Sequence, residues 1–262
     1  MASNDRKRKH TRWNNKVKQK SVEAGVSGLF FTCDGREKDA LHEAYCIIDE
    51  LLENTSNGIS TEKEEVKEEN SGDESEEDIA DALKKACDDE RTAKTPGNKK
   101  ERRCKQRPTG VKNCLFIAVK DADAILLAEK MVDLTQKSPR CRHLQRVLPV
   151  ESTAEIDLQK LNDLVAAAIS KYLVKKSDDS WPTYSLEFKA RNNDSISKGA
   201  VLEMLDDAIL AFAPGAKCSL SGAEVTLFVQ VVRTTMMVGV CRDFYGRRKY
   251  SMRPAGPDTK NE

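Results

Sequence analysis

The sequence predicts an α+β fold made of two small units, each a sheet covered by helices on one face. Runs of β-prone residues alternate with amphipathic segments of helical period on both sides of residue 150. Pairs that contain proline or glycine separate these runs. A long charged stretch interrupts the first unit, and blocks of like charge stay solvated because they cannot bury themselves.

The first unit begins with a short apolar run at residues 26–33, which predicts a buried strand, and Asp34-Gly35 turns the chain. Apolar residues at helical spacing then predict a helix over residues 36–52. A strand and one helix make an incomplete core, so their partners must lie beyond the charged stretch. The partners expected there are a strand at residues 114–119, a helix capped by Asp121 and a strand at residues 146–150.

The second unit is predicted to open with a helix, because Ser152-Thr-Ala-Glu155 matches a capping box. Tyr184, Leu186 and Phe188 alternate with polar residues, which is the pattern of a half-buried strand. The remaining expected elements are a helix capped by Ser197 and ended by Pro214-Gly215, and two strands at residues 224–233 and 236–242.

The formal net charge of +1 conceals three charged blocks. Residues 1–20 carry eight Lys/Arg and one Asp, residues 53–90 carry fifteen acids and four lysines, and residues 94–107 carry seven bases and one acid. The basic run at residues 5–13 fits a nuclear import signal, an RNA-attracting arm or a solvating tail. No run approaches the ~18 apolar residues of a membrane span, and the N-terminus lacks the apolar core of a secretion signal.

The residues argue against a metal site and against catalysis. The eight cysteines include no C-x-x-C pair and there are only three histidines, so we expect reduced thiols in a nuclear or cytosolic protein. The sequence contains no G-x-G-x-x-G after a strand, no P-loop and no G-x-S-x-G elbow. We therefore expect no catalytic residue, no cofactor, no metal and no small-molecule substrate.

A first candidate site follows Phe188. If Phe188 faces the core, Lys189 and Arg191 share the outward face of the strand, and Asn192 and Asn193 continue toward a helix start. Cations, amides and the free N–H groups of a helix start can bind phosphate. The alternative is an ordinary polar strand face followed by a turn, and spacing alone does not decide between the two.

A second candidate is the basic ending at residues 242–250. Its cations could hold phosphates while its aromatic residues stack on unpaired bases. Alternatively, the aromatic residues pack on the domain. The cations are Arg242, Arg247, Arg248 and Lys249, with Arg253 nearby, and the aromatic residues are Phe244, Tyr245 and Tyr250.

Two serines in the acidic block, Ser71 and Ser75, are each followed by acids (SGDE and SEED). This context suits an acidophilic kinase, whose product would deepen the local negative charge. An unmodified, solvated linker is the alternative.

Five stretches in a fixed order resemble the THUMP-domain tRNA acetylation adaptors. They are GLFFTCDGREKDALHEAY at residues 28–45, GVKNCLFI at residues 110–117, RVLPV, KARNN, and the ending VCRDFYGRRKY. The resemblance implies a ferredoxin-like N-terminal domain, interrupted by an acidic insertion and followed by a THUMP domain. It also implies a non-catalytic partner of the nuclear RNA cytidine acetyltransferase, needed for N4-acetylcytidine in the D-arm of serine and leucine tRNAs. Lys189, Arg191 and Asn192 occupy the family's K-x-R-N-N pattern, and Arg248-Lys249-Tyr250 its R-K-Y ending.

The expected organisation is a basic disordered tail (1–24), a ferredoxin-like domain in two parts (25–52 and 110–150) around a disordered insertion (53–109), a THUMP domain (151–250) and a disordered tail (251–262). The expected partners are tRNA and the acetyltransferase, and the expected location is the nucleus or the nucleolus. Two alternatives remain open. One is a protein-interaction module that works through the acidic insertion, and the other is a THUMP-bearing tRNA-modifying enzyme, whose catalytic domain we do not recognise in the sequence up to Glu262.

Overall fold

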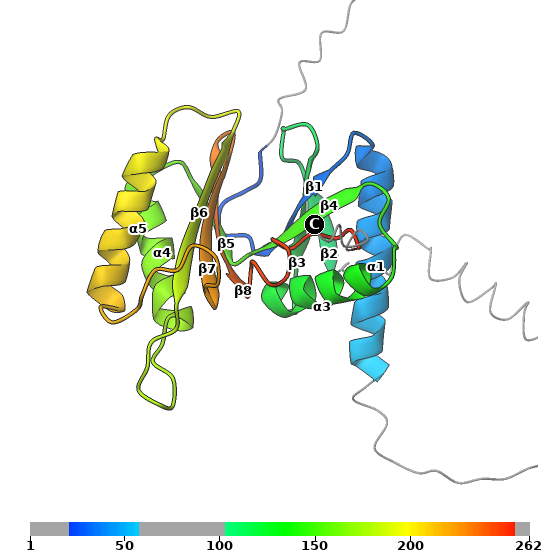
Figure 1. Cartoon of the computed structure of the whole chain (residues 1–262). Helices are drawn as coiled ribbons and strands as arrows, with labels where there is room; N and C mark the ends of the chain where they lie inside the picture. The colour runs from blue at the N-terminus through cyan, green and yellow to red at the C-terminus, as the bar shows by residue number, and fades with distance from the viewer. Residues whose placement is uncertain (1–20, 58–102, 255–262) are drawn as a thin grey trace, which may run out of the picture.

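The computed structural model describes residues 21–57 and 103–254. Two four-stranded sheets lie side by side, with α4 and α5 on the far side of one and α1 and α3 against the other (Figure 1). The α+β class with two sheets is therefore confirmed.

The first sheet is antiparallel, with the strand order β2-β3-β1-β4. Its chain order is β-α-β-β-α-β. The elements are β1 (Gly28–Cys33), α1 (Glu37–Asn57), β2 (Cys104–Arg107), β3 (Cys114–Val119), α3 (Ala124–Lys137) and β4 (Leu144–Val150).

The second sheet has the order β5-β8-β7-β6, in which β6 and β7 are parallel and the other pairs antiparallel. Its elements are β5 (Ser152–Glu155), α4 (Leu158–Tyr172), β6 (Tyr184–Arg191), α5 (Lys198–Phe212), β7 (Val225–Val232) and β8 (Thr235–Arg242). The predicted strands near residues 184, 224 and 236 and the helix capped by Ser197 are confirmed.

Strand β7 is buried along its whole length because both faces of its sheet are covered. Leu227, Val229 and Val231 face the core formed with α4 and α5. Phe228 and Val232 join the core of the first unit instead. The two units therefore pack against each other directly, and this packing fixes the shape of the space between the two sheets.

The predicted helix start at Ser152 is wrong. Residues Ser152–Glu155 form β5, which pairs with β8, and α4 begins at Leu158. Asp157 caps that helix, because its Oδ1 accepts from the Gln159 N–H at 2.8 Å. The hydroxyl of Thr153 is used in a tertiary contact, donating to the Glu23 carbonyl at 2.7 Å. The capping-box pattern could not show that an open edge of β8 was available for pairing.

Two boundaries of the predicted insertion at residues 53–109 also need correction. Helix α1 continues to Asn57, and β2 lies at Cys104–Arg107. All four residues of this edge strand pair with β3, but only Cys104 is buried, so the segment looks like a basic cluster in the sequence. The cap of α3 is Asp123, not Asp121, which lies in the preceding turn at a φ of 59°. The expectations for residues 1–20, 58–102 and 255–262, including Ser71 and Ser75, lie outside the described residues.

The chain after β8 returns to the first unit. Phe244, Tyr250 and Met252 are buried in that unit's core, and Ser251 bridges to Arg146 of β4. The predicted disordered tail at residues 251–262 is therefore wrong for residues 251–254, which belong to the fold. Apolar Met252, isolated among polar residues, gave no periodic signal in the sequence.

The seven cysteines among the described residues are free thiols. Burial raises the pKa of Cys33 and of Cys104 to about 11, whereas Cys46 and Cys218 are exposed. The thiolate is the reactive form. We therefore expect iodoacetamide near neutral pH to modify Cys46 and Cys218 before Cys33 and Cys104, as read by peptide mass spectrometry. Equal labelling of Cys33 in the native protein would contradict this packing.

Candidate functional site

A groove of about 590 Å³ lies between the two sheets. Its walls come from β1, β4 and the loop before β3 on one side, and from β6 and β7 on the other, with the segment after β8 closing one part. Two acids, Asp34 and Glu187, line it together with six basic residues, which are Lys112, Arg146, Lys189, Arg191, Lys249 and Arg253. A cleft lined by an excess of one sign concentrates ligands of the opposite sign, so this groove suits an anion.

Lys189 and Arg191 reach the groove because β6 alternates. Leu186, Phe188 and Ala190 pack toward the core with α4 and α5. Successive side chains of a strand point to opposite faces, so Lys189 and Arg191 share the other face, as predicted. The structure adds that this face looks across the groove at the first unit.

The guanidinium of Arg191 is held in place at the joint between the units. Its central carbon lies 5.3 Å from the ring centroid of Phe30, which belongs to β1. It also donates to the amide oxygen of Gln230 in β7. Burial lowers the pKa of Arg191, yet an arginine stays charged at physiological pH. An arginine has five N–H donors, so an oriented one can still offer donors to an anion.

Two further cations in the groove, Lys112 and Arg146, were not singled out from the sequence, whereas Arg253 was noted only as a neighbour of the basic ending. Arg146 lies in β4 opposite Thr32 of β1, and its side chain is exposed. Arg253 pairs with Asp34 at 3.3 Å. The alternation of Arg146 with the buried Val147 was a usable signal. Nothing local could have placed Lys112 or Arg253 in the same groove.

The two asparagines after Arg191 have different surroundings. Asn193 donates from Nδ2 to the Arg233 carbonyl at 2.8 Å and accepts from the Ser195 N–H at 3.0 Å. It therefore builds the turn, as the alternative interpretation expected. Asn192 is exposed with a φ of 51°. Helix α5 starts at Lys198 and runs on the far side of the second sheet, so its N-terminus does not line the groove.

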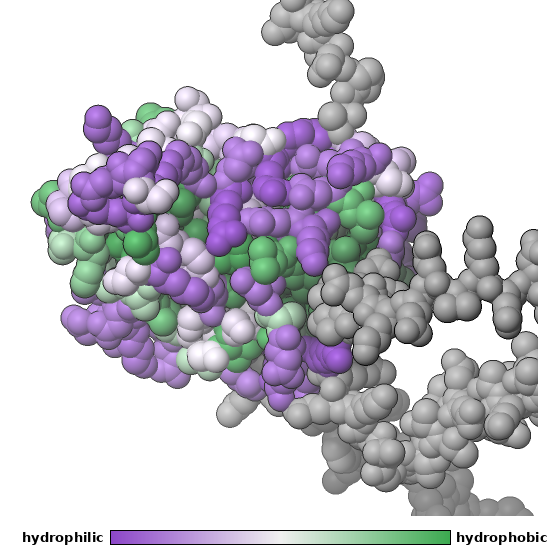
Figure 2. Space-filling model, turned by 90° about the horizontal axis from the view of Figure 1, so that it is seen from below, coloured by the Kyte–Doolittle hydropathy of each residue, from purple (hydrophilic) through white to green (hydrophobic). Residues whose placement is uncertain are grey.

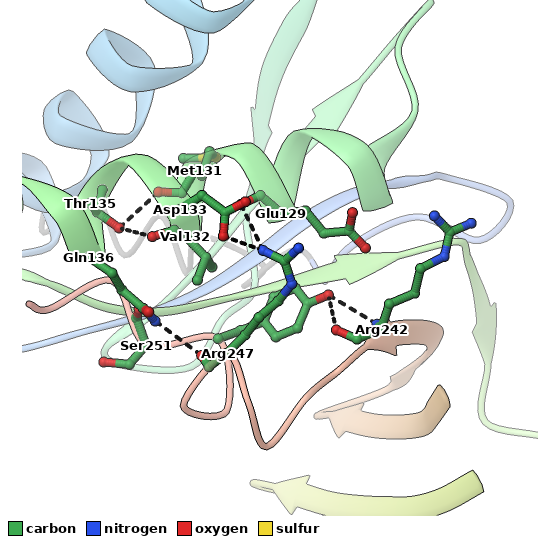
Figure 3. Close-up of polar contacts among 10 residues, drawn as sticks. Glu129, Met131, Val132, Asp133, Thr135, Gln136, Arg242, Arg247 and Ser251 are labelled. Atoms are coloured by element: carbon green, nitrogen blue, oxygen red, sulfur yellow. Dashed lines mark hydrogen bonds and ion pairs between the residues drawn. The ribbon is translucent and has the colours of Figure 1, made fainter. Parts of the chain in front are cut away.

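Most cations of the predicted basic ending at residues 242–250 do not line the groove. Arg247 forms an ion pair with Asp133 of α3 (Figure 3). Arg248 donates to the Arg253 carbonyl at 3.0 Å, and Arg242 is exposed at the end of β8. Of the four cations predicted at residues 242–250, Lys249 alone lines the groove, together with the nearby Arg253.

The aromatic residues of this ending pack inward. Phe244 is 6% exposed and Tyr250 is fully buried, with the two rings stacked at 6.1 Å between centroids. Neither can stack on a base without leaving the core, so the packing interpretation is correct for both. Tyr245 is half-buried, and its hydroxyl lies 3.5 Å from Glu187.

Seen from below, the described surface is largely hydrophilic, with hydrophobic patches toward the helices of the second unit and across the middle (Figure 2). Within the described ranges, no group of three potential metal ligands comes together. None of the helices described there is long and apolar enough to cross a membrane.

Comparison with known proteins gives one consistent likeness in sequence. No protein-family model matches the chain. THUMP domain-containing protein 1 of Mus musculus is 24% identical over 246 residues, covering 92% of this chain and 68% of that protein. Its Homo sapiens counterpart is 23% identical over 237 residues, covering 89% and 65%. The chain is thus similar along most of its length to THUMP domain-containing proteins, while it spans about two thirds of these relatives.

Solved structures give weaker matches. The solution structure of the THUMP domain of THUMP domain-containing protein 1 covers 32% of this chain and 84% of that domain, at 16% identity and a TM-score of 0.29. A 4-thiouridine synthetase in complex with RNA and ATP covers 83% of this chain and 42% of that one, at 10% identity and a TM-score of 0.41.

Proposed function

We propose that this protein is a non-catalytic adaptor that binds tRNA in the basic groove and presents it to an RNA cytidine acetyltransferase. The product would be N4-acetylcytidine in the D-arm of serine and leucine tRNAs, made in the nucleus. The similarity to THUMP domain-containing protein 1 along 92% of the chain supports a THUMP-family role. The acetylation partner and the tRNA classes rest on the motif resemblance.

The two domains of this proposal are a ferredoxin-like unit and a THUMP unit. The β-α-β-β-α-β order of the first unit, with β4-β1-β3-β2 in the sheet, supports the ferredoxin-like assignment. The THUMP assignment of the second unit is supported by the KARNN motif, which falls in β6 and its following loop, whereas the RRKY motif lies after β8, where the chain packs on the first unit.

The observation that carries RNA binding is the composition of the groove. Six cations and two acids from both units face one cavity, and Arg191 is oriented there by Phe30 and Gln230. Phosphate contacts of this kind release counterions, so they make affinity fall steeply with salt. An RNA that lies in the groove would contact both units at once, which suits recognition of shape more than of sequence.

The test is a gel-shift titration of unmodified tRNA with the purified chain at increasing salt, followed by an acetylation assay. We expect log K to fall linearly with log salt, by roughly 0.7 to 0.9 per phosphate neutralised. We expect acetylcytidine only when the acetyltransferase is added. Modification by the purified chain alone would favour the enzyme alternative. A chain that shifts no tRNA at low salt would favour the protein-interaction alternative.

A further inference from the structure

Three consecutive residues after β8 have a left-handed backbone, and none is glycine. The φ angles of Arg248, Lys249 and Tyr250 are 52°, 56° and 56°. Residues with a Cβ are less stable in this region because the Cβ lies too close to the following carbonyl oxygen. Such conformations persist only where surrounding contacts impose them, and they gather at functional sites. Contacts from the surrounding structure must therefore hold Arg248, Lys249 and Tyr250 in this conformation.

One side chain clamps the turn at both ends. The Gln136 amide nitrogen, on α3, donates to the Arg247 carbonyl at 3.1 Å and to the Ser251 carbonyl at 2.8 Å (Figure 3). These carbonyls flank the left-handed residues. On the opposite side, the buried hydroxyl of Tyr250 donates to the Arg242 carbonyl and accepts from the Arg242 N–H, both at 3.1 Å. The turn is thereby tied to α3 and to the end of β8.

The turn holds a cation at the groove. Lys249 is exposed and lines the cavity, with its Nζ 5.5 Å from the Tyr245 ring centroid. Arg253, four residues after Lys249, lines the same cavity. Its carbonyl accepts from Arg248 at 3.0 Å. Reversing the backbone at Lys249 would move its side chain away from this wall.

We propose that Gln136 is a positioning residue for RNA binding, acting through the left-handed turn that presents Lys249 to the RNA backbone. This inference rests on the proposed function. Gln136 touches no RNA itself. Its two N–H bonds hold the turn, and the turn sets where Lys249 meets a phosphate.

The test combines Gln136→Met, which keeps the side-chain length and removes the N–H donors, with Lys249→Gln and the double variant. We expect each single variant to bind tRNA several-fold more weakly and the salt slope to fall by about 1. We expect the double variant to bind no more weakly than Lys249→Gln, because coupled residues are not additive. Gln159→Met, at an exposed position of α4, is the matched control and should bind as the wild type does.

A second readout does not depend on RNA. Amide hydrogen exchange at residues 247–251 should quicken in Gln136→Met and stay unchanged in Gln159→Met, because exchange reports local opening. Unchanged exchange in Gln136→Met would overturn the inference, as would losses of affinity that add in the double variant. If Gln136→Met speeds exchange at residues 247–251 as expected but the wild-type protein binds no tRNA, the role of Gln136 in holding the turn would stand and the proposed function would be wrong.

Discussion

Reversing Lys189 and Arg146 together (Lys189→Glu with Arg146→Glu) is expected to weaken tRNA binding by roughly a hundredfold at low salt, about tenfold per reversed residue. The two side chains come from opposite walls of the groove, on β6 and β4. Both are exposed, so the new carboxylates stay in water and the fold is preserved. The measurement is a tRNA titration by fluorescence anisotropy at several salt concentrations.

The control for this experiment is Lys198→Glu, an exposed lysine at the start of α5 on the far side of the second sheet. It changes net charge without changing the groove, and we expect at most a small loss of affinity from long-range electrostatics. An equal loss from Lys198→Glu and from either single groove variant would show that binding depends on overall charge and not on the groove.

Arg191 is unsuitable for charge reversal, although it shares a strand face with Lys189. A glutamate there would place a carboxylate against the Phe30 ring and the Gln230 amide oxygen, in a half-buried position. An unpaired buried charge is strongly destabilising. Weak binding by an Arg191→Glu variant would therefore report damage to the joint between the units.

Tyr250→Ala is expected to reduce the free energy of unfolding by about 3–5 kcal/mol, the range for large aromatic truncations in cores. The ring is fully buried against Phe244, and its hydroxyl satisfies both backbone groups of Arg242. Its loss leaves a cavity in the first unit and unpaired groups at the end of β8 in the second. Urea unfolding followed by circular dichroism measures the change.

The matched variant is Tyr250→Phe, which removes only the hydroxyl and should cost about 1–3 kcal/mol, because two backbone groups lose their partner. A cost below about 1 kcal/mol for Tyr250→Ala would contradict full burial. The two variants together separate packing from hydrogen bonding at this residue.

The same residue gives a pH dependence. Burial raises the pKa of Tyr250 above its ordinary value of 10.0. The unfolded chain therefore loses this proton first as pH rises, so the contribution of Tyr250 to stability is fully present below pH 10 and declines above it. We expect the stability advantage of the wild type over Tyr250→Phe to shrink between about pH 10 and 11.5.

Local patterns in the sequence determined most of the elements and several of their ends. The apolar run at Cys114–Val119 forms β3 with those bounds, and Ser197 caps α5 as expected. The pattern failed where a tertiary partner decided the outcome. Ser152–Glu155 became a strand because β8 offered an edge, and Cys104–Arg107 became a strand because β3 did. Hydrogen bonding to a distant edge leaves no trace in local periodicity.

In the candidate site, too, local sequence determined some features and tertiary packing decided the others. Sequence alternation by itself determined that Lys189 and Arg191 share a face of β6, because the period of a strand is fixed by its backbone. Only the tertiary structure decided what lies opposite that face. It brought Lys112, Arg146 and Arg253 into the groove and took Arg247 into an ion pair with Asp133. Local sequence encodes which way a side chain points, whereas the packing of two units decides what it meets.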